Sequence, residues 1–469
     1  MHIPSRLEPL LAAGAPAVDL ARRFGDAGYS LYLVGGSVRD ALLGRDSDGI
    51  DDLDLTTDAE PNDVVRLVRP WAEAVFDVGA EYGTIGAMLR GTKYEITTFR
   101  SEAYRDESRK PRVTFSSSIE EDLSRRDFTV NAVALRIPAS STDAPAVVDP
   151  HGGLGDIAAK VLRTPLDPAI SFGDDPLRML RLFRFQATLG FIPESAALET
   201  AAALKDRLGI ISAERIRDEL DKLIVGNHVA VALWGFIDSG LAGEFLPELP
   251  ALGLAKDPGH RHKDVLAHTI AVVEKTAPRL TLRLAALLHD IGKPATRSFA
   301  DGGVSFHHHE VVGARMARQR LRALRYPRQR VEDVSQLVFL HMRPHTYKMG
   351  WTDSAVRRYV RDAGPLLADL NGLVRSDVTT KSARRANAVQ RRIDELEERI
   401  AELREQEELD SLRPPIDGHA VMAYLDLAPG PVVGRIMDML LEHRIEEGPY
   451  SEEEAFRMLD AWRDPGGEG

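Results

Sequence analysis

The chain contains no cysteine among its 469 residues. Disulfide bonds, catalytic thiolates and cysteine-ligated zinc are therefore excluded, and any metal ion must be held by histidine or carboxylate side chains. Long apolar runs are absent as well, because no stretch of eighteen apolar residues occurs and the first residues lack the apolar core of a signal peptide. We therefore expect a cytoplasmic protein without a membrane-spanning segment.

Positive charge is scarce, since 60 lysines and arginines face 72 acidic residues and leave a formal net charge of -12. An acidic chain of this kind can bind RNA only where its positive charge is concentrated. Residues 313–330 are rich in arginine and contain no acid, and smaller basic groups lie at 357–361 and 381–385. These clusters could neutralise RNA phosphates, or they could be solvated helix faces.

A chain of this length is too long for one core, so several domains are expected. Strand-like and helical segments alternate in the first part, and the rest of the chain has helical periodicity. We predict an α+β fold, with a small mixed sheet flanked by helices and followed by all-helical regions. The predicted regions are a head at 1–160, a helical neck at 161–250, a third unit at 251–380 and a helical tail at 381–469.

The most informative stretch is the segment 31–44, which reads Leu-Tyr-Leu-Val-Gly-Gly-Ser-Val-Arg-Asp-Ala-Leu-Leu-Gly. A short apolar strand runs into a turn at Gly35 and Gly36, and a helix begins at Ser37. The glycines let the backbone approach a phosphate, and the free amides and positive dipole end of the helix favour an anion. We expect the turn from Gly35 to Arg39 to hold a triphosphate, although a lone Gly-Gly turn can also be purely structural.

Two carboxylates follow on a second strand. Side chains alternate along a strand, so Asp52 and Asp54 should project from one face. Two oxygen donors side by side can bind Mg²⁺, or a pair of such ions that activate a hydroxyl and stabilise a leaving oxygen. Glu95, on another strand-like segment, is a further candidate for this face. Acids in such a loop can also be merely solvated, but their occurrence beside the glycine turn indicates nucleotidyl transfer.

The turn, the segment Asp52-Leu-Asp-Leu-Thr-Thr and the segment Arg125-Arg-Asp-Phe-Thr-Val-Asn-Ala resemble the class II tRNA nucleotidyltransferase and bacterial poly(A) polymerase family. Three further blocks continue the resemblance, at 172–181, 184–185 and 212–220. The resemblance implies a polymerase-β-like head and a helical neck. It also implies addition of CMP and AMP from CTP and ATP to the 3′ end of tRNA, with release of pyrophosphate. CC-adding, A-adding and poly(A) polymerases share these motifs, so the choice among them is open.

The same resemblance implies roles for residues outside the turn. Arg126 and Asp127 would lie at the nucleotide's sugar, where the carboxylate could accept a ribose hydroxyl and so select ribonucleotides. Arg181 and Arg184 would bind the nucleotide as well. The polar segment 100–115 resembles flexible loops of the family, and its residues have no assignable individual roles.

A third motif concerns the choice of base. The spacing places Arg178 on the same helical face as Asp174 and Asp175. An Asp acceptor beside an Arg donor suits the pairing edges of cytosine and adenine, whereas guanine and uracil present the opposite order of groups. The family has Glu at the position of Asp174, so Asp175 and Arg178 are the better candidates. A helix cap with an intrahelical ion pair is the simpler alternative.

The third region contains a histidine and aspartate pattern. The apolar segment 284–288 leads into His289-Asp290-Ile-Gly-Lys, which resembles the HD phosphohydrolase superfamily. The resemblance implies a set of ligands made of imidazoles and carboxylates: His268, His289, Asp290, His309, His341 and Asp377. Without thiolates, such a set suits Mn, Fe, Co, Ni or Mg better than structural zinc. A metal-bound hydroxide would then attack phosphorus, unless the site is a relic.

Two other classes of function are open at this point. The chain could be a metal phosphohydrolase whose head only binds RNA, or a noncatalytic RNA chaperone that depends on its arginine clusters. Paired carboxylates beside a phosphate-binding turn favour the nucleotidyltransferase, because a pure binding domain does not need them.

Overall fold

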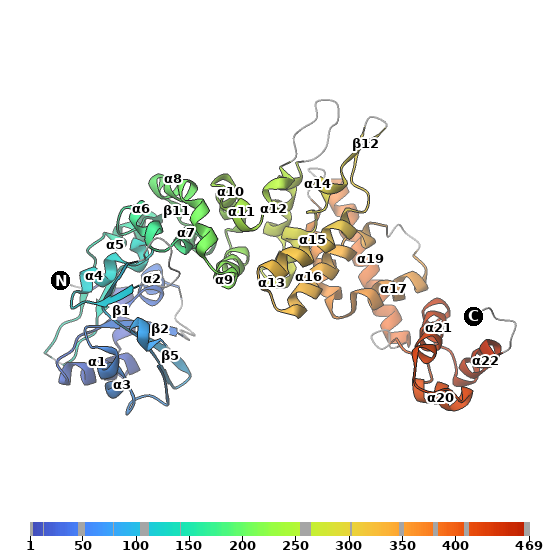
Figure 1. Cartoon of the computed structure of the whole chain (residues 1–469), viewed down its shortest axis with the longest axis horizontal. Coiled ribbons are helices and arrows are strands. Elements are labelled where there is room, and N and C mark those ends of the chain that lie inside the picture. The colour runs from blue at the N-terminus through green and yellow to red at the C-terminus, as the bar shows by residue number, and fades with distance from the viewer. Residues whose placement is uncertain are drawn as a thin grey trace. The chain divides into compact units, whose positions relative to one another are not determined.

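The computed structural model describes most of the chain, namely residues 3–12, 14–45, 52–77, 79–103, 112–140, 142–253, 264–300, 303–346, 351–378, 383–407 and 412–463. The chain divides into two compact units, Met1–Pro250 and Ala251–Gly469 (Figure 1). The N-terminal unit contains the sheet and the helices that follow it, and the C-terminal unit is almost entirely helical. The finer division into four regions stays a prediction.

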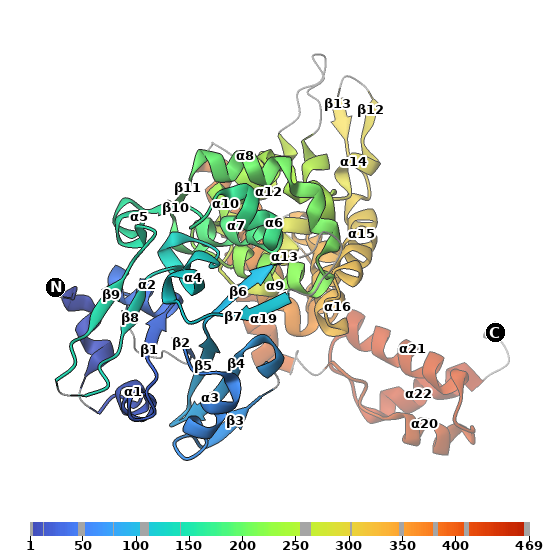
Figure 2. The ribbon, with the colours of Figure 1, turned by 60° about the vertical axis from the view of Figure 1, so that its left-hand side comes forward.

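The head is built on a seven-stranded sheet in the order β3-β4-β5-β2-β1-β8-β9. Its strands, which can be followed in Figure 2, are β1 (Leu31–Val34), β2 (Asp52–Thr57), β3 (Ala74–Phe76), β4 (Thr84–Leu89), β5 (Thr92–Thr98), β8 (Ala134–Arg136) and β9 (Ala146–Val148). Strands β2 and β5 pair in parallel, and the other neighbours pair antiparallel. The mixed sheet predicted for the α+β head is confirmed.

The register of β2 and β5 positions the acidic residues. Asp52 lies opposite Lys93, and Asp54 lies opposite Glu95. Paired residues of neighbouring strands point to the same face of a sheet, so these side chains share one face near its centre. Leu55 and Ile96 are buried on these two strands. The alternation predicted for β2 therefore produces the expected grouping of carboxylates.

Helices surround the sheet: α1 (Pro16–Asp26), α2 (Gly36–Leu43), α3 (Pro61–Val68), α4 (Ile119–Ser124) and α5 (Gly153–Ala159). Two segments differ from expectation. The polar segment 100–115 begins and ends in a hairpin, β6 (Arg100–Ala103) with β7 (Arg112–Phe115), and its residues 104–111 lie outside the described part. The segment 143–154, whose proline, glycine and small residues predict a surface connection, contains β9, because its backbone pairs with β8.

The neck is helical, as predicted. Its helices are α6 (Pro168–Asp174), α7 (Leu177–Leu189), α8 (Ser195–Ala203), α9 (Ala213–Ile224), α10 (Val229–Asp238) and α11 (Leu241–Phe245). Helix α7 packs against both α9 and α10. The spacing of Leu177, Leu180, Phe183 and Ala187 in the sequence predicts one apolar helical face, and all four residues are buried. Burial of this face holds α7 firmly, which fixes the direction of its polar side chains.

The C-terminal unit contains the helices α12 (Val265–Lys275), α13 (Leu280–Leu288), α14 (Lys293–Thr296), α15 (His309–Ala323), α16 (Arg328–Leu340), α17 (Asp353–Ala363), α18 (Leu367–Ser376), α19 (Ala383–Glu407), α20 (Gly418–Leu425), α21 (Pro431–Glu447) and α22 (Glu452–Arg463). A short hairpin joins β12 (Ser298–Ala300) to β13 (Gly303–Ser305). Helix α13 is buried and contacts α12, α16 and α18. On α19 the helical spacing of Ile393, Leu396, Ile400 and Leu403 predicts an apolar row, and all four residues are buried.

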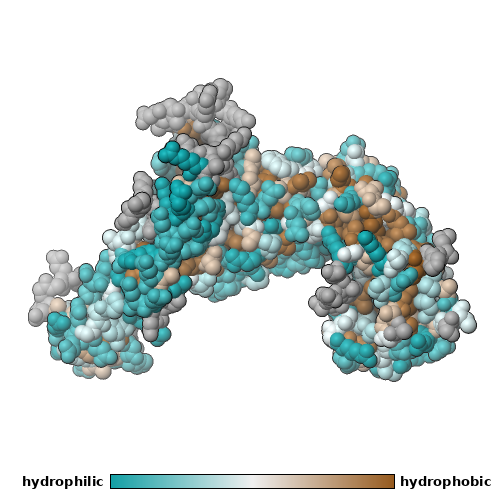
Figure 3. Space-filling view, turned by 180° about the vertical axis from the view of Figure 1, so that it is seen from behind, coloured by the Kyte–Doolittle hydropathy of each residue, from teal (hydrophilic) through white to brown (hydrophobic). Residues whose placement is uncertain are grey.

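Among the described residues, no helix is both long enough and apolar enough to cross a membrane. Hydrophilic side chains cover most of the face shown in Figure 3, and apolar side chains gather there in smaller groups.

Candidate nucleotide-binding cavity and metal cluster

A cavity of about 400 Å³ lies in the N-terminal unit. It is lined by α2, β2, α7, α9 and the segment that follows α4. Its lining residues are Gly35, Gly36, Arg39, Asp54, Arg126, Asp127, Asn131, Arg181, Arg184, Phe185, Thr188 and Lys222. The fold thus brings one predicted metal ligand together with the predicted phosphate turn and four of the predicted arginines, from segments far apart in sequence.

The glycine turn is pressed against the carboxylate of Asp54. Gly35 has φ +72° and ψ -137°, a conformation that only glycine adopts without strain. A Cβ atom at Gly35 would lie 2.9 Å from Oδ2 of Asp54. The Ser37 hydroxyl donates to the Val34 carbonyl at 3.1 Å, which ties the first turn of α2 to the end of β1. Glycine is therefore needed at position 35 for its backbone conformation and for space.

The three acidic candidates of the head form one negatively charged group. Lys93 contacts Glu95, and its Nζ lies 3.8 Å from Oδ2 of Asp52. Burial and the nearby Glu95 raise the pKa of Asp52. Burial also raises the pKa of Asp54, although Arg126 opposes the shift. Carboxylates whose ionised form is disfavoured in this way fit a site for a divalent cation, whose charge would compensate them.

A buried aspartate that the sequence analysis did not single out supports the arginines. Asp122 on α4 is fully buried, and its Oδ1 accepts from Arg125 at 2.6 and 2.9 Å. Its Oδ2 accepts from Arg126 and from the Thr56 hydroxyl, both at 3.2 Å. The signal was present, because an acid three and four residues before a pair of arginines on a helix can bond to both. Asp122 holds Arg126 at the cavity.

Asp127 is buried at the cavity wall, and each of its carboxylate oxygens has a partner. Its Oδ2 lies 2.6 Å from the guanidinium of Arg181, and its Oδ1 accepts from the Phe128 amide at 2.8 Å and from Asn131 at 3.0 Å. Burial by itself would raise the pKa of Asp127, but Arg181, with smaller contributions from Asn131 and other arginines, lowers it to about 2. The carboxylate is therefore ionised and can accept one further hydrogen bond.

Asp127→Asn tests this electrostatic assignment. The pKa of Asp127 in the folded protein, about 2, lies below its ordinary value of 3.8. The ionised carboxylate therefore contributes its full share to the free energy of unfolding above about pH 4, and this contribution is lost as the pH falls toward 2. We expect the variant to be less stable by about 2 kcal/mol at pH 7. In urea unfolding from pH 7 to pH 3, the difference from the parent should narrow below pH 4. A difference that does not change with pH would refute the assignment.

Four lining residues were missed by the sequence analysis: Asn131, Phe185, Thr188 and Lys222. Asn131 accepts from Arg39 at 2.6 Å and donates to Asp127, so it links two cavity residues. The guanidinium of Arg184 lies 4.0 Å from the centre of the buried Phe185 ring, within range of a cation–π contact. Helical spacing could have indicated Thr188, which lies one turn beyond Arg184 on α7.

The predicted base-reading residues do not share a helical face, and that expectation is wrong. Helix α6 ends at Asp174, and α7 begins at Leu177. Pro176 disfavours the helical conformation for the residue before it, and Asp175 is extended with φ -136° and ψ 100°. Two separate helices therefore replace the single one that the three- and four-residue spacing assumed.

The side chains of this motif have partners of their own. Arg178 is buried and donates to the Ser171 hydroxyl at 2.9 Å and to the Arg125 carbonyl. Asp175 pairs with Arg215 on α9 at 3.1 Å. These residues join the neck to the segment that carries Arg126 and do not line the described cavity.

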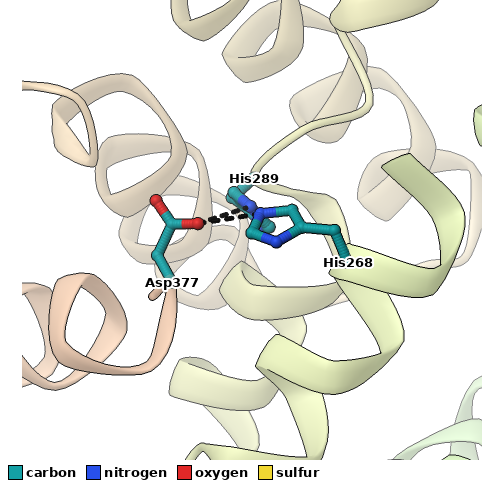
Figure 4. Close-up of side chains that lie close together, drawn as sticks. All are labelled: His268, His289 and Asp377. Atoms are coloured by element: carbon teal, nitrogen blue, oxygen red, sulfur yellow. Dashed lines mark ion pairs between the residues drawn. The ribbon is translucent and has the colours of Figure 1, made fainter. Parts of the chain in front are cut away.

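In the C-terminal unit the predicted histidines and acids converge. Asp377 follows α18, and its Oδ1 lies 2.9 Å from Nε2 of His268 on α12 and 3.6 Å from Nε2 of His289 after α13. Figure 4 shows both imidazoles directed toward this carboxylate. The three ligand atoms lie close enough together to hold one metal ion.

Asp290, His309 and His341 form a second group of three. The Nε2 atom of His309 lies 3.5 Å from Oδ1 of Asp290 and 3.3 Å from Nε2 of His341. The other oxygen of Asp290 lies 3.2 Å from Nε2 of His289, so this carboxylate touches both groups. The structure thus brings together all six predicted ligands.

The backbone orients three of these imidazoles. The Nδ1 atoms of His289, His309 and His341 lie 2.8, 2.8 and 2.6 Å from the carbonyls of Ala286, Phe306 and Val338. A proton assigned to each Nδ1 leaves the Nε2 lone pair free, and each Nε2 faces the cluster. This arrangement, with no thiolate, fits a divalent ion better than a buried group of ordinary core histidines.

The comparisons with known proteins agree with this geometry. Residues 31–163 match the family described as the Poly A polymerase head domain, and residues 265–403 match the HD domain. Residues 190–252 match the family described as Probable RNA and SrmB- binding site of polymerase A. Residues 31–163 thus resemble a poly A polymerase head domain, and residues 265–403 resemble an HD domain. The chain's resemblance to the family of CCA-adding enzymes and poly(A) polymerases is confirmed.

The relatives found by sequence match the first half of the chain. A CCA-adding enzyme of Bacillus pumilus is 41% identical over 51% of this chain and 56% of its own length. One of Streptococcus gordonii is 40% identical over 52% of this chain and 58% of its own length. The chain thus spans a little over half the length of the curated relatives it matches.

Solved structures resemble the chain over nearly its whole length. The Bacillus stearothermophilus CCA-adding enzyme in complex with CTP matches with a TM-score of 0.67 and 24% identity, over 98% of both chains. The Thermotoga maritima CCA-adding enzyme complexed with tRNA matches with a TM-score of 0.59 and 15% identity, also over 98% of both chains. At these identities the likeness shows the fold.

Proposed function

We propose that this protein adds CMP and AMP from CTP and ATP to the 3′ end of tRNA, completing or repairing CCA without a nucleic acid template. The observation that carries the proposal is the cavity in which the Gly35–Gly36 turn, Asp54 and the arginines of α7 meet. The sequence relatives named CCA-adding enzyme support the proposal. The structurally similar CCA-adding enzymes solved with CTP and with tRNA support it as well. The substrates place the proposed reaction in the cytoplasm.

In this proposal Asp52, Asp54 and Glu95 would hold Mg²⁺, which lowers the pKa of an attacking 3′ hydroxyl and stabilises departing pyrophosphate. The backbone amides at Gly36 and Ser37 donate to the triphosphate at the start of α2. Arg39, Arg181 and Arg184, which also line the cavity, add positive charge. These residues orient the triphosphate for attack, which makes the reaction effectively unimolecular.

The sugar and the base would be selected by different groups. Asp127 accepts a ribose hydroxyl, and Arg126, held by Asp122, lies beside the carboxylate of Asp54. Asp175 and Arg178 select cytosine and adenine. Asp174, whose side chain is one methylene shorter than the Glu of the family, lies beside them in sequence. For this, the nucleotide base replaces Arg215 and Ser171 as their hydrogen-bonding partners. We assign the head to 1–160, the neck to 161–250, the HD region to 251–380 and the tail to 381–469.

The test is incorporation of labelled CTP and ATP, singly and together, into a tRNA transcript that ends at the discriminator base, followed by sequencing of the added residues. Three additions that read CCA are expected. CC alone, a single A on a CC-ended transcript, or a long A tract would identify a CC-adding, A-adding or poly(A) enzyme instead. Absence of incorporation would contradict the proposal and favour an RNA-binding head.

A second proposed activity belongs to the HD domain. The convergence of His268, His289, Asp290, His309, His341 and Asp377 supports a site for one or two divalent ions such as Mn, Fe, Co, Ni or Mg. Such an ion would supply a hydroxide for attack on a phosphate ester. Lys293, whose Nζ donates to Asp290 at 2.6 Å, orients that carboxylate.

We expect the double variant His289→Ala/Asp290→Ala to lose most of its bound transition metal, because these two residues contact both halves of the cluster. Metal content is measured by mass spectrometry after dialysis against a mixture of the candidate ions. His419→Ala, an exposed histidine on α20, is the control and should keep the metal. Equal metal content in both variants would argue against the site. CTP incorporation should be unaffected by either change.

A further inference from the structure

A row of arginines runs along the exposed side of α15, the helix that begins at His309. Arg315, Arg318 and Arg322 are exposed and stand at positions i, i+3 and i+7, which lie on one face of a helix. The opposite face is buried through Gly313, Ala317 and Leu321. We call these three arginines the arginine stripe. The packing of α15 on its apolar side keeps the stripe directed outward.

The stripe has no direct ion pair. Among the residues that the structure describes, no acid forms an ion pair with Arg315, Arg318 or Arg322. Glu332, on the adjoining helix α16, pairs with Arg328 at 2.7 Å. The hydrogen bond from Arg328 lowers the pKa of Glu332, and Arg318 and Arg322 contribute to the shift from farther away.

Other arginines of the same unit are paired. Arg357 and Arg444 both bind the buried carboxylate of Glu407, at 2.9 and 2.5 Å. Arg375 pairs with Asp394 and with Glu397, each at 2.7 Å. The stripe therefore differs from these structural arginines, because it is a concentrated positive charge with no ion pair to any described acid, in a chain whose net charge is -12.

We propose that the arginine stripe binds the phosphodiester backbone of the RNA substrate, as a docking surface separate from the catalytic cavity. Guanidinium groups bind phosphate oxygens through paired, fixed donors and are less strongly hydrated than ammonium groups. Seven residues of helix rise about 10 Å, so the stripe is long enough to meet more than one phosphate of a strand. Because the ligand is taken to be tRNA, the inference rests on the proposed function.

The geometry favours RNA over a membrane surface. A helix that lies on a membrane needs an exposed apolar face opposite its basic one. On α15 that face is already buried within the protein. An extended polyanion that follows the helix can instead neutralise all three arginines without burying apolar surface.

The test is the triple variant Arg315→Gln/Arg318→Gln/Arg322→Gln. Binding of a fluorescent tRNA transcript is measured by anisotropy between 50 and 300 mM KCl. We expect the affinity for tRNA to fall about tenfold or more near physiological salt. The slope of log affinity against log salt should decrease in magnitude by about 2 to 3, because binding with fewer phosphate contacts releases fewer counterions from the RNA. The KM for CTP at saturating tRNA should be unchanged, because the stripe is not part of the cavity.

A matched control removes the same charge elsewhere in the unit. Arg391 and Arg392 on α19 and Arg435 on α21 are exposed, and Arg391→Gln/Arg392→Gln/Arg435→Gln should leave the salt slope nearly as in the parent. Melting temperatures of both variants show that each is folded. If the two triple variants bind tRNA alike, the proposal is overturned, and it is overturned equally if a polyglutamate peptide of matched charge competes as well as RNA does.

The outcomes also separate this proposal from the proposed function. If the parent protein adds CCA and the stripe variant binds tRNA normally, the docking surface is wrong and the nucleotidyltransferase assignment stands. If the parent protein binds tRNA in a stripe-dependent manner but adds no nucleotide, the surface stands and the assignment fails.

Discussion

Replacement of Asp52 and Asp54 by alanine should lower the rate of CTP incorporation by about a thousandfold or more, which corresponds to roughly 4 kcal/mol of lost transition-state stabilisation. The two carboxylates stand on one face of β2, beside Glu95 and across from the glycine turn. Their removal abolishes the proposed metal site without touching the arginines of the cavity. The measurement is single-turnover incorporation at saturating CTP and Mg²⁺.

The affinity of the double variant for tRNA should be close to that of the parent, which separates loss of chemistry from loss of binding. Glu60→Gln is a suitable control, because Glu60 is an exposed acid that directly precedes α3 in the same head. It should incorporate CTP at the parental rate. Substantial residual activity in the Asp52→Ala/Asp54→Ala protein would exclude these two residues as the metal ligands of the reaction.

Gly35→Ala should lower kcat/KM for CTP by about a hundredfold or more. The added methyl group would lie 2.9 Å from Oδ2 of Asp54, in a backbone conformation with φ +72° that is already unfavourable for alanine. Either the turn or the carboxylate must move. A shift of about 1 Å between a phosphate-binding turn and a metal-binding carboxylate is enough for such a loss. Steady-state kinetics with varied CTP measure the effect.

Gly28 provides a matched control for this substitution. It has φ +86°, and a Cβ atom built at this position meets nothing within 4 Å. Gly28→Ala therefore introduces comparable backbone strain in the same unit without a new contact, and it should lower thermal stability while leaving kcat/KM nearly unchanged. Equal catalytic losses in the two variants would mean that strain alone, and not the approach to Asp54, explains the effect of Gly35→Ala.

The sequence predictions that succeeded concern local features of the chain. The glycine turn and the alternating acids of β2 are local patterns, set by backbone conformation and by the two-residue period of a strand. The buried rows on α7 and α19 follow the helical period in the same way. Such features depend on near neighbours in the chain, so they can be derived from one sequence.

The base-reading motif shows where local spacing failed. Counting from Asp174 to Arg178 assumed one continuous helix, but Pro176 divides the segment and Asp175 turns away to Arg215. Arg178 instead reaches Ser171 and the backbone of Arg125. The partner of each side chain here lies on another element, and its identity depends on how the neck packs against the segment after α4.

The sequence by itself determined the glycine turn, the paired acids, the helical character of residues 161–250 and the set of six histidine and aspartate residues, because each follows from a short pattern and the resemblance that such patterns carry. Only the tertiary structure decided that Asp122 supports Arg126 and that Lys222 and Phe185 line the cavity. It also decided that, in the part of the chain that the structure describes, no acid forms an ion pair with Arg315, Arg318 or Arg322. Contacts between elements far apart in the chain depend on packing and burial, and no local period encodes them.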